Sequence, residues 1–177
     1  MKKTLQGQVA IVTGGSKGIG YGIAQALAAA GVHVAITGRD AESLGQARAR
    51  LQAATGQDVM TLAVDVRDHA GVQRAVDQVV QRFGGLDILV NNAGVGAFVP
   101  VSEMTPEQWA TTIDTNLTGV FNVCRASLSA LRSRGGGYII NISSLAGKNA
   151  FVGAGAYCAS KAGLNASGEA LTQEVRH

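Results

Sequence analysis

Five blocks of apolar residues recur along the chain, and each predicts a β-strand. The blocks are nearly continuous in apolar side chains and lack strict alternation, which is typical of strands buried on both faces of a parallel sheet. They cover residues 9–12, 32–37, 59–64, 86–90 and 138–142. The stretches between the blocks have helical spacing. A run from Ile19 to Leu27 ends at Gly31, and glycine commonly ends helices.

Polar residues mark the starts of further helices. Asp40 precedes a helical run over residues 44–51, and the threonine-proline pair at 105–106 is typical of an N-cap followed by proline in the first turn. We also expect helices over residues 72–83, 111–131 and 159–174. The alternation of strand and helix predicts an α/β fold: a Rossmann-type, doubly wound parallel sheet with right-handed crossovers. Without a linker or repeat, residues 1–177 are expected to form one dinucleotide-binding domain.

Composition and charge exclude several classes of protein. The chain has 177 residues, of which 46% are hydrophobic and 15% charged, and glycines and charged residues interrupt the apolar runs before any reaches the length of a membrane span. Lys2 and Lys3 are not followed by an apolar run, so no signal peptide is expected. Cys124 and Cys158 fit no disulfide or metal-ligand spacing, which favours a reduced, cytoplasmic protein without a metal. The net charge of +3 is scattered without interleaved aromatic residues, so no nucleic-acid partner is expected.

A glycine-rich loop follows the first predicted strand and runs into the first predicted helix. Such glycines let the main chain turn tightly and approach a pyrophosphate, while the helix offers its free N–H groups and the positive end of its dipole. The strand-loop-helix placement therefore predicts a dinucleotide-phosphate site. The loop covers residues 13–20 and includes Gly14, Ser16, Lys17, Gly18, Ile19 and Gly20.

The end of the second strand is expected to select the cofactor. An acidic residue there binds the adenosine ribose hydroxyls of NAD(H), whereas a basic residue accepts the 2′-phosphate of NADP(H). Asp40 keeps NAD(H) open, but it also stands where the next helix needs an N-cap, and we favour that role. Arg39 and Lys17 supply cations. We therefore expect NADP(H) to be preferred, with NAD(H) as the alternative.

Tyr157 and Lys161 lie four residues apart, so in a helix they share one face. A neighbouring ammonium lowers the pKa of a phenol, which is ordinarily about 10, and so makes it a usable general acid. Ser144 lies just beyond the strand over residues 138–142, at the carboxyl edge of the sheet where ligands bind. One cleft is therefore expected to hold the glycine loop, the serine and the tyrosine-lysine pair.

Together these residues resemble the short-chain dehydrogenase/reductase family. The resemblance runs in order from Gly7 to Lys161, and it is close to simple reductases of 3-oxoacyl thioesters. It implies the strand order 3-2-1-4-5 and an oxidoreductase acting on a small carbonyl compound or secondary alcohol. Its motifs are the glycine loop, Asp65-Val66, Asn91-Asn92-Ala93-Gly94, Asn116, Ser144, Tyr157 and Lys161.

The resemblance also implies roles for single residues. Asp65 would bind the adenine, and Asn92 would hold the sheet and cofactor region. Asn116, Ser144, Tyr157 and Lys161 would form a catalytic tetrad: the serine binds the carbonyl oxygen, the tyrosine protonates it, the lysine binds the nicotinamide ribose and lowers the tyrosine pKa, and the asparagine helps to position a water. Because Ser143 is a neighbour of similar chemistry, it is the spacing to Tyr157 that selects Ser144.

Family members usually continue past the point where this sequence stops, with two further strands that help to close the substrate pocket. The resemblance therefore implies a chain truncated at its carboxyl end, with an unpaired edge strand over residues 138–142. The helices over residues 111–131 and 159–174 resemble those of the family's dimer interface, so a homo-oligomer, dimer or tetramer, is expected. A catalytically silent nucleotide-binding or scaffold protein is the alternative, and an isomerase or dehydratase on a related sheet is a third.

The large aromatic residues leave two interpretations. Trp109 and the phenylalanines at 98, 121 and 151 are expected mainly in the core. Phe98 and Phe151 follow motif strands, however, and the substrate mouth is the alternative place for them. The identity of the substrate is not encoded in any of these motifs, because one fold serves many substrates.

Overall fold

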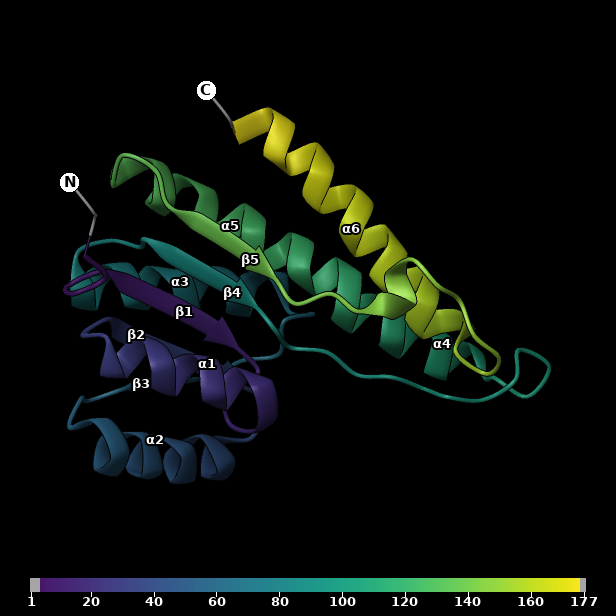
Figure 1. Ribbon diagram of the computed structural model, residues 1–177, viewed down its shortest axis with the longest axis horizontal. Coiled ribbons are helices and arrows are strands. Elements are labelled where there is room, and N and C mark those ends of the chain that lie inside the picture. Colours follow the sequence, from purple (N-terminus) through teal and green to yellow (C-terminus); the bar gives the residue numbers. More distant parts are fainter. Residues whose placement is uncertain (1–3, 176–177) are drawn as a thin grey trace.

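The computed structural model describes residues 4–175, and at its centre lies a five-stranded sheet in the order β3-β2-β1-β4-β5 (Figure 1). Every neighbouring pair of strands is parallel. The predicted fold class and strand order are therefore confirmed. The strands are β1 (Val9–Thr13), β2 (His33–Gly38), β3 (Met60–Ala63), β4 (Ile88–Asn91) and β5 (Tyr138–Asn141).

Helices cover both faces of this sheet, as a doubly wound fold requires. Helices α1 (Gly18–Ala29) and α2 (Ala41–Thr55) pack on one face, while α3 (His69–Phe83) and α5 (Gly119–Ser133) pack on the other. Helix α4 (Pro106–Ile113) lies beyond the carboxyl ends of the strands, and α6 (Gly155–Val175) begins there and runs back alongside α5 and β5 (Figure 1). Among the described residues, no helix is long and apolar enough to cross a membrane.

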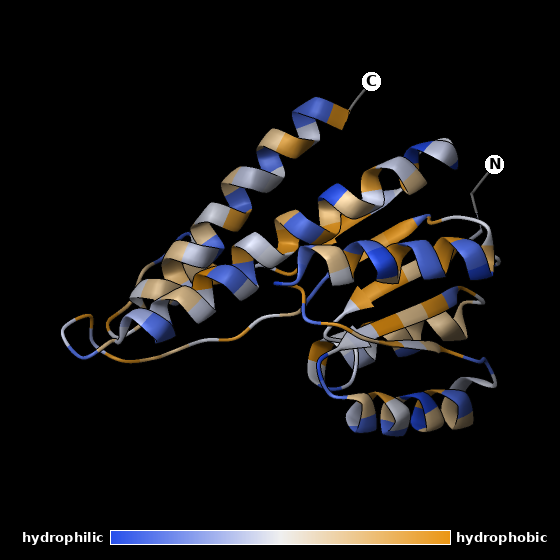
Figure 2. Ribbon diagram, turned by 180° about the vertical axis from the view of Figure 1, so that it is seen from behind, coloured by the Kyte–Doolittle hydropathy of each residue, from blue (hydrophilic) through white to orange (hydrophobic). Residues whose placement is uncertain are grey.

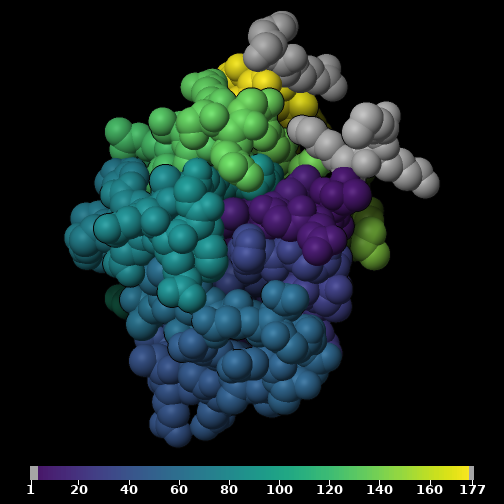
Figure 3. Space-filling model, turned by 90° about the vertical axis from the view of Figure 1, so that its left-hand side faces the viewer, coloured from purple at the N-terminus to yellow at the C-terminus, as the bar shows by residue number. Residues whose placement is uncertain are grey.

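The core consists of two apolar layers separated by the sheet. Val12 and Ile36 pack against α1 and α2 on one side, and Ile11 and Leu89 pack against α3 and α5 on the other. Figure 2 shows the strands as apolar bands between amphipathic helices. Figure 3, seen from the amino ends of the strands, shows the purple segment that leads into β1 between the green segment that leads into β5 and the blue segments below it. Burial on both faces holds the inner strands rigidly in place.

The capping residues named from the sequence act as expected. The Asp40 side chain accepts hydrogen bonds at the start of α2, and Thr105 forms a capping box with Gln108 at the start of α4. Helix α3 ends at Gly84, which adopts the left-handed conformation (φ 80°) that glycine tolerates best. These local signals fix where the helices begin and end.

The outer strands are less buried than the apolar pattern predicted. In β5 the side chains of Tyr138 and Ile140 are exposed, and in β3 only Leu62 is fully buried. The prediction of burial on both faces is wrong for these two strands, because each has one strand neighbour and incomplete helical cover. Within residues 4–175, β5 is an edge strand, as expected.

The helix expected over residues 111–131 is interrupted. A single turn of π-helix, η1 (Asp114–Thr118), joins α4 to α5, and Asn116 lies in it. π-Turns within helices occur frequently at functional sites.

The prediction that the large aromatic residues lie in the core is also wrong, since all four have exposed side chains: Phe98, Trp109, Phe121 and Phe151.

Candidate nucleotide-binding and catalytic site

A pocket of about 400 Å³ opens at the carboxyl ends of β1 to β4. It brings together most of the residues predicted from the sequence to bind a dinucleotide: Gly14, Ser16, Lys17, Ile19, Arg39, Asp65, Val66, Asn92, Ala93 and Gly94. Four predicted residues do not line it: Gly18 and Gly20 of the loop, and Tyr157 and Lys161 of α6. Gly18 begins α1 with a φ of 57°, and Gly20 is buried beneath the loop.

Close approach of two loops explains the glycines at 14 and 20. Gly14 has a φ of 64°, and a Cβ there would lie 3.0 Å from the Ala93 Cα. A Cβ on Gly20 would overlap the carbonyl oxygen of Gly14 and the side-chain amide of Asn92. The loop after β1 therefore rests directly on the loop after β4, and only hydrogen fits between them.

Thr13 and Asn92 lock these loops together. The Thr13 hydroxyl accepts hydrogen bonds from the backbone N–H groups of Asn92 and Ala93, at 2.9 and 3.0 Å. The Asn92 side chain donates in return to the carbonyl oxygens of Thr13 and Gly14, at 2.9 and 3.1 Å. The sequence motif named Asn92 but not the role of Thr13, although the threonine begins the same motif.

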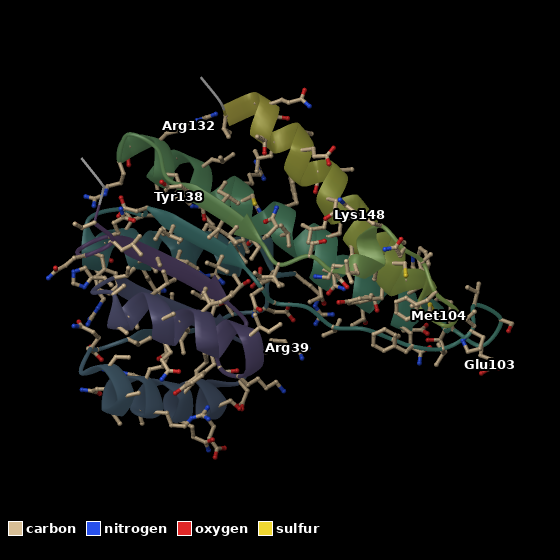
Figure 4. All side chains as sticks on the ribbon, viewed as in Figure 1. Arg39, Glu103, Met104, Arg132, Tyr138 and Lys148 are labelled. Carbon is tan, nitrogen blue, oxygen red and sulfur yellow. The ribbon has the colours of Figure 1, made fainter. Side chains whose placement is uncertain are left out.

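The two candidates for reading the adenosine ribose differ in how free they are. The Asp40 carboxylate accepts from the backbone N–H groups of Glu42 and Ser43 and from the Ser43 hydroxyl, and the bonds from Ser43 hold the Asp40 pKa below its usual value. This aspartate is committed to capping α2. Arg39 lies at the end of β2 and lines the pocket with Lys17 (Figure 4). The pocket therefore offers cations rather than a free carboxylate at this position.

Asp65 carries a charge that is held in place. The Arg67 guanidinium donates to both carboxylate oxygens, with Nη2 2.6 Å from Oδ2, and the Arg67 backbone N–H donates to Oδ1. These bonds, with a smaller contribution from the positive charge of Arg39, lower the Asp65 pKa. The carboxylate stays ionised and oriented at the rim of the pocket, where it can accept a hydrogen bond from a base.

Asn116 joins three segments on the side of the molecule that carries Tyr157 and Lys161. Its Oδ1 accepts from the Val95 N–H at 2.8 Å, and its Nδ2 donates to the Val95 carbonyl oxygen at 2.8 Å and to the Ser160 hydroxyl at 3.0 Å. Ser160 in turn donates to the Tyr157 carbonyl oxygen at 2.8 Å. The side-chain amide of Asn116 therefore joins η1, the loop after β4 and α6. Sequence reasoning missed Ser160, although it lies between the two motif residues of α6.

Lys161 reaches from α6 across to the end of β5. Its ammonium donates to the Ile142 carbonyl oxygen at 2.7 Å and lies 5.8 Å from the centre of the Tyr157 ring. Burial lowers the Lys161 pKa from its usual value. Within residues 4–175 the Tyr157 hydroxyl makes no hydrogen bond. The predicted tyrosine-lysine pair thus shares one face of α6, with the phenol available to a ligand.

The two adjacent serines are used differently. Ser143 donates to Asn165 Oδ1 at 2.6 Å, inside the groove between β5 and α6. Ser144 caps the short 3-10 helix η2 (Leu145–Gly147) by accepting from the Ala146 N–H at 3.1 Å. In the part of the chain that the structure describes, the Ser144 O–H has no acceptor. Of the two hydroxyls, that of Ser144 is the one able to donate to a ligand.

The pocket fits the phosphate-ribose part of a dinucleotide. Two features of this chain support the fit: the loop face that is kept free of side chains at Gly14, and the Thr37 hydroxyl, a buried polar atom in the pocket wall without a hydrogen-bond partner. Backbone N–H groups at the start of α1 and the cations of Lys17 and Arg39 complement negative charge. The fold and the pocket together define a nucleotide-binding α/β protein, and a serine, a tyrosine and a lysine lie on the segments that follow β5.

Comparison with known proteins identifies the family. The model of the short chain dehydrogenase family matches residues 8–177. The chain is 38% identical over 175 residues to the 3-oxoacyl-[acyl-carrier-protein] reductase of Chlamydia muridarum, covering 99% of this chain and 71% of that protein. The chain belongs to the short chain dehydrogenase family.

Solved structures agree. A metagenomic short-chain oxidoreductase in complex with NADP superposes with a TM-score of 0.92 at 40% identity, covering 98% of this chain and 79% of that one. NAD⁺-bound xylitol dehydrogenase superposes with a TM-score of 0.93 at 33% identity, covering 97% of this chain and 66% of that one. The chain therefore spans about two thirds to four fifths of these relatives.

The contact between the two loops predicts opposite effects of two similar substitutions. Gly20→Ala should abolish measurable NADPH binding, because the added methyl group overlaps the Gly14 carbonyl and displaces the phosphate loop. Gly22→Ala, two residues further along α1, meets no atom within 4 Å and should leave affinity unchanged. It should also raise the free energy of unfolding by about 0.5–1 kcal/mol. Titration of NADPH fluorescence and thermal unfolding measure both; equal affinities of the two variants would contradict this account of the loop.

Proposed function

We propose that this chain is the nucleotide-binding and catalytic part of an NADP(H)-dependent oxidoreductase that interconverts a carbonyl compound and a secondary alcohol. One observation carries the proposal. The Ser144 hydroxyl, just past β5, is free to donate, and Tyr157 packs against the cluster that contains Ala146 of the same segment. Lys161 is anchored there on the Ile142 carbonyl oxygen. A general acid with a second hydrogen-bond donor beside a dinucleotide pocket is the arrangement that carbonyl reduction requires.

The pocket residues divide by the part of the cofactor that each would hold. The loop of Gly14, Ser16, Lys17, Gly18, Ile19 and Gly20 would receive the phosphates. Asp65 and Val66 would bind the adenine, and Tyr157 and Lys161 would bind the nicotinamide ribose. Asn92, Ala93 and Gly94 form the floor against the glycine loop. The bound cofactor supplies or accepts the hydride.

The protein's own part in the reaction is to bind and protonate the carbonyl oxygen. Ser144 donates a hydrogen bond to that oxygen, and the Tyr157 hydroxyl transfers its proton to it. Lys161 presents a positive charge to the phenol and so stabilises the phenolate left behind. The Asn116 side chain already makes three hydrogen bonds, so its part is to hold η1 and α6 in place, and a water of the proton relay would be bound by main-chain carbonyls instead.

NADP(H) is proposed over NAD(H) on the charges around the ribose site. Arg39 and Lys17 face the pocket, while Asp40 is committed to its N-cap. One close relative was solved with NADP and another with NAD⁺, so the family uses both. A guanidinium recognises a phosphate through paired, charge-assisted hydrogen bonds.

Removing the phenol hydroxyl tests the proposed chemistry. Tyr157→Phe should lower kcat for NADPH-dependent reduction of an activated ketone about 10²–10⁴-fold, the usual contribution of general acid catalysis. NADPH affinity should stay within about twofold of the parent value. Tyr138→Phe, at the opposite end of β5, is the matched control and should change neither. Full activity of Tyr157→Phe would overturn the assignment, and NADPH binding without turnover in the parent protein would favour a catalytically silent nucleotide-binding protein.

Removing the Arg39 charge tests the cofactor preference. Arg39→Ala should weaken NADPH binding about 10–100-fold, which corresponds to the loss of a hydrogen bond between charged groups. NADH binding should change less than about twofold. Arg48→Ala removes a surface arginine that pairs with Asp58 outside the pocket and should affect neither cofactor. A parallel loss of NADPH and NADH affinity in Arg39→Ala would show that the arginine does not read the 2′-phosphate.

Self-association is proposed through the helices beside the site. A groove of about 530 Å³ between α5 and α6 is lined by apolar side chains including Leu117, Val120, Leu128 and Leu171, and Phe121 stands exposed at its side. We expect a dimer or tetramer by light scattering, and Phe121→Asp should shift it toward the monomer. A monodisperse monomer of the parent chain contradicts this prediction.

Cys124 and Cys158 are free and buried, and a cytoplasmic location stays a prediction from the sequence.

A further inference from the structure

Two exposed phenylalanines stand beside the Tyr157 ring. Phe98 lies in the loop after β4 and Phe151 in the loop before α6, and their exposed fractions are 60% and 54%. Their ring centres are 6.4 Å apart with the planes 16° from parallel, and the Phe98 ring centre lies 5.4 Å from that of Tyr157. We call Phe98 and Phe151 the aromatic wall. The aromatic wall extends from the Tyr157 ring toward solvent.

Gly96, in the loop after β4, leaves space for the Phe98 ring. A Cβ at Gly96 would lie 2.8 Å from two atoms of the Phe98 ring and 3.3 Å from the Tyr157 ring. A side chain at position 96 would require the Phe98 ring to shift. Gly96 therefore leaves room for the Phe98 ring where it lies, beside Tyr157.

The surroundings of the wall are apolar as well. Leu145 follows Ser144 and is 80% exposed, and Val152 follows Phe151 and is 96% exposed. Residues 94–104 and 143–157, which frame the wall, include two charged side chains, Glu103 and Lys148. Lys148 lines the groove between β5 and α6, and Glu103 lies at the tip of its loop (Figure 4). The side chains next to the reacting phenol thus offer apolar area and few hydrogen-bonding groups.

We propose that the aromatic wall is a substrate subsite that selects carbonyl compounds bearing an aryl or extended apolar group next to the carbonyl carbon. This inference rests on the proposed function, since it places the carbonyl oxygen at Ser144 and Tyr157. The apolar group then lies over Phe98 and Phe151 and removes their exposed rings from water. Burial of this ring surface by a bound substrate favours apolar substrates, in proportion to the area that is removed from water.

The same chemistry disfavours polyhydroxylated substrates. A sugar-like ketone would place hydroxyl groups against phenyl rings, and each hydroxyl that loses water there without a new partner lowers affinity. The NAD⁺-bound xylitol dehydrogenase has the same fold, so the difference in substrate class would come from loop residues and not from the sheet.

Two α-keto esters that differ in one substituent test the subsite. Ethyl benzoylformate carries a phenyl group where ethyl pyruvate carries a methyl group, so the two esters differ only in the group next to the ketone. With NADPH we expect kcat/KM for the phenyl compound to exceed that for the methyl compound about tenfold or more. Xylulose, a polyhydroxylated ketone, should be reduced more slowly than either. Fluorine NMR of ethyl 4-fluorobenzoylformate with the NADP⁺-loaded protein reports binding without turnover.

Variants assign the preference to the wall. Phe151→Ala, which does not contact Tyr157, and Phe98→Ala should each lower kcat/KM for ethyl benzoylformate about tenfold and broaden the fluorine signal less. In both variants the ratio of kcat/KM for ethyl benzoylformate to that for ethyl pyruvate should fall about tenfold. Tyr138→Ala removes an aromatic side chain of similar exposure (59%) at the amino end of β5 and should leave both substrates unaffected.

The outcomes separate this inference from the function it rests on. If the parent protein reduces ethyl pyruvate and ethyl benzoylformate equally well, or prefers xylulose, the subsite is wrong while the oxidoreductase function stands. If neither ester is reduced, the function fails for these ketones, and the subsite is then decided by whether Phe98→Ala and Phe151→Ala abolish binding of the fluorinated ester. Unchanged binding in both variants overturns it.

Discussion

The hydrogen bonds of the buried Asn116 side chain are the interaction on which the arrangement of η1, α6 and the loop after β4 depends. Its amide makes three hydrogen bonds, two to the backbone of Val95 and one to Ser160. These bonds join a π-turn, the loop after β4 and helix α6, which have no sheet hydrogen bonds in common. An unsatisfied buried amide costs about 1–3 kcal/mol, so the three segments are strongly favoured in one relative arrangement. This arrangement fixes the positions of the Tyr157 and Lys161 side chains, because both residues lie on α6.

The nucleotide half is organised by a different constraint, which is lack of space. The loops after β1 and β4 approach so closely that Gly14 and Gly20 admit no side chain, and the bonds between Thr13 and Asn92 hold them there. A phosphate-binding surface made of main chain must stay free of side chains on its open face and be supported from behind. Both conditions are met by residues of one sequence motif, because parallel strands bring their carboxyl ends to the same edge of the sheet.

These constraints explain how far the sequence predicts the structure. Local patterns predict the inner strands and the helix caps at Asp40 and Thr105, since each depends on neighbours within a few residues. The grouping of the motif residues follows from the geometry of a parallel sheet. The π-turn at Asn116 does not follow, because it is stabilised by Val95 and Ser160, which are distant in sequence. The exposure of β5 likewise depends on what lies beside it, not on its own apolar residues.

The aromatic residues show why exposure carries more information than hydrophobicity. A phenylalanine in a sequence predicts burial, and Phe98 would be buried if the chain could close over it. Instead Gly96 admits its ring beside Tyr157 while more than half of the side chain faces water. Two rings beside the Tyr157 hydroxyl stay exposed in the folded chain. The free energy of removing them from water is therefore not used in folding and can contribute to ligand binding. The hydrophobic free energy that folding leaves unused at Phe98 is therefore available for binding an apolar ligand beside Tyr157, where the proposed function places the substrate.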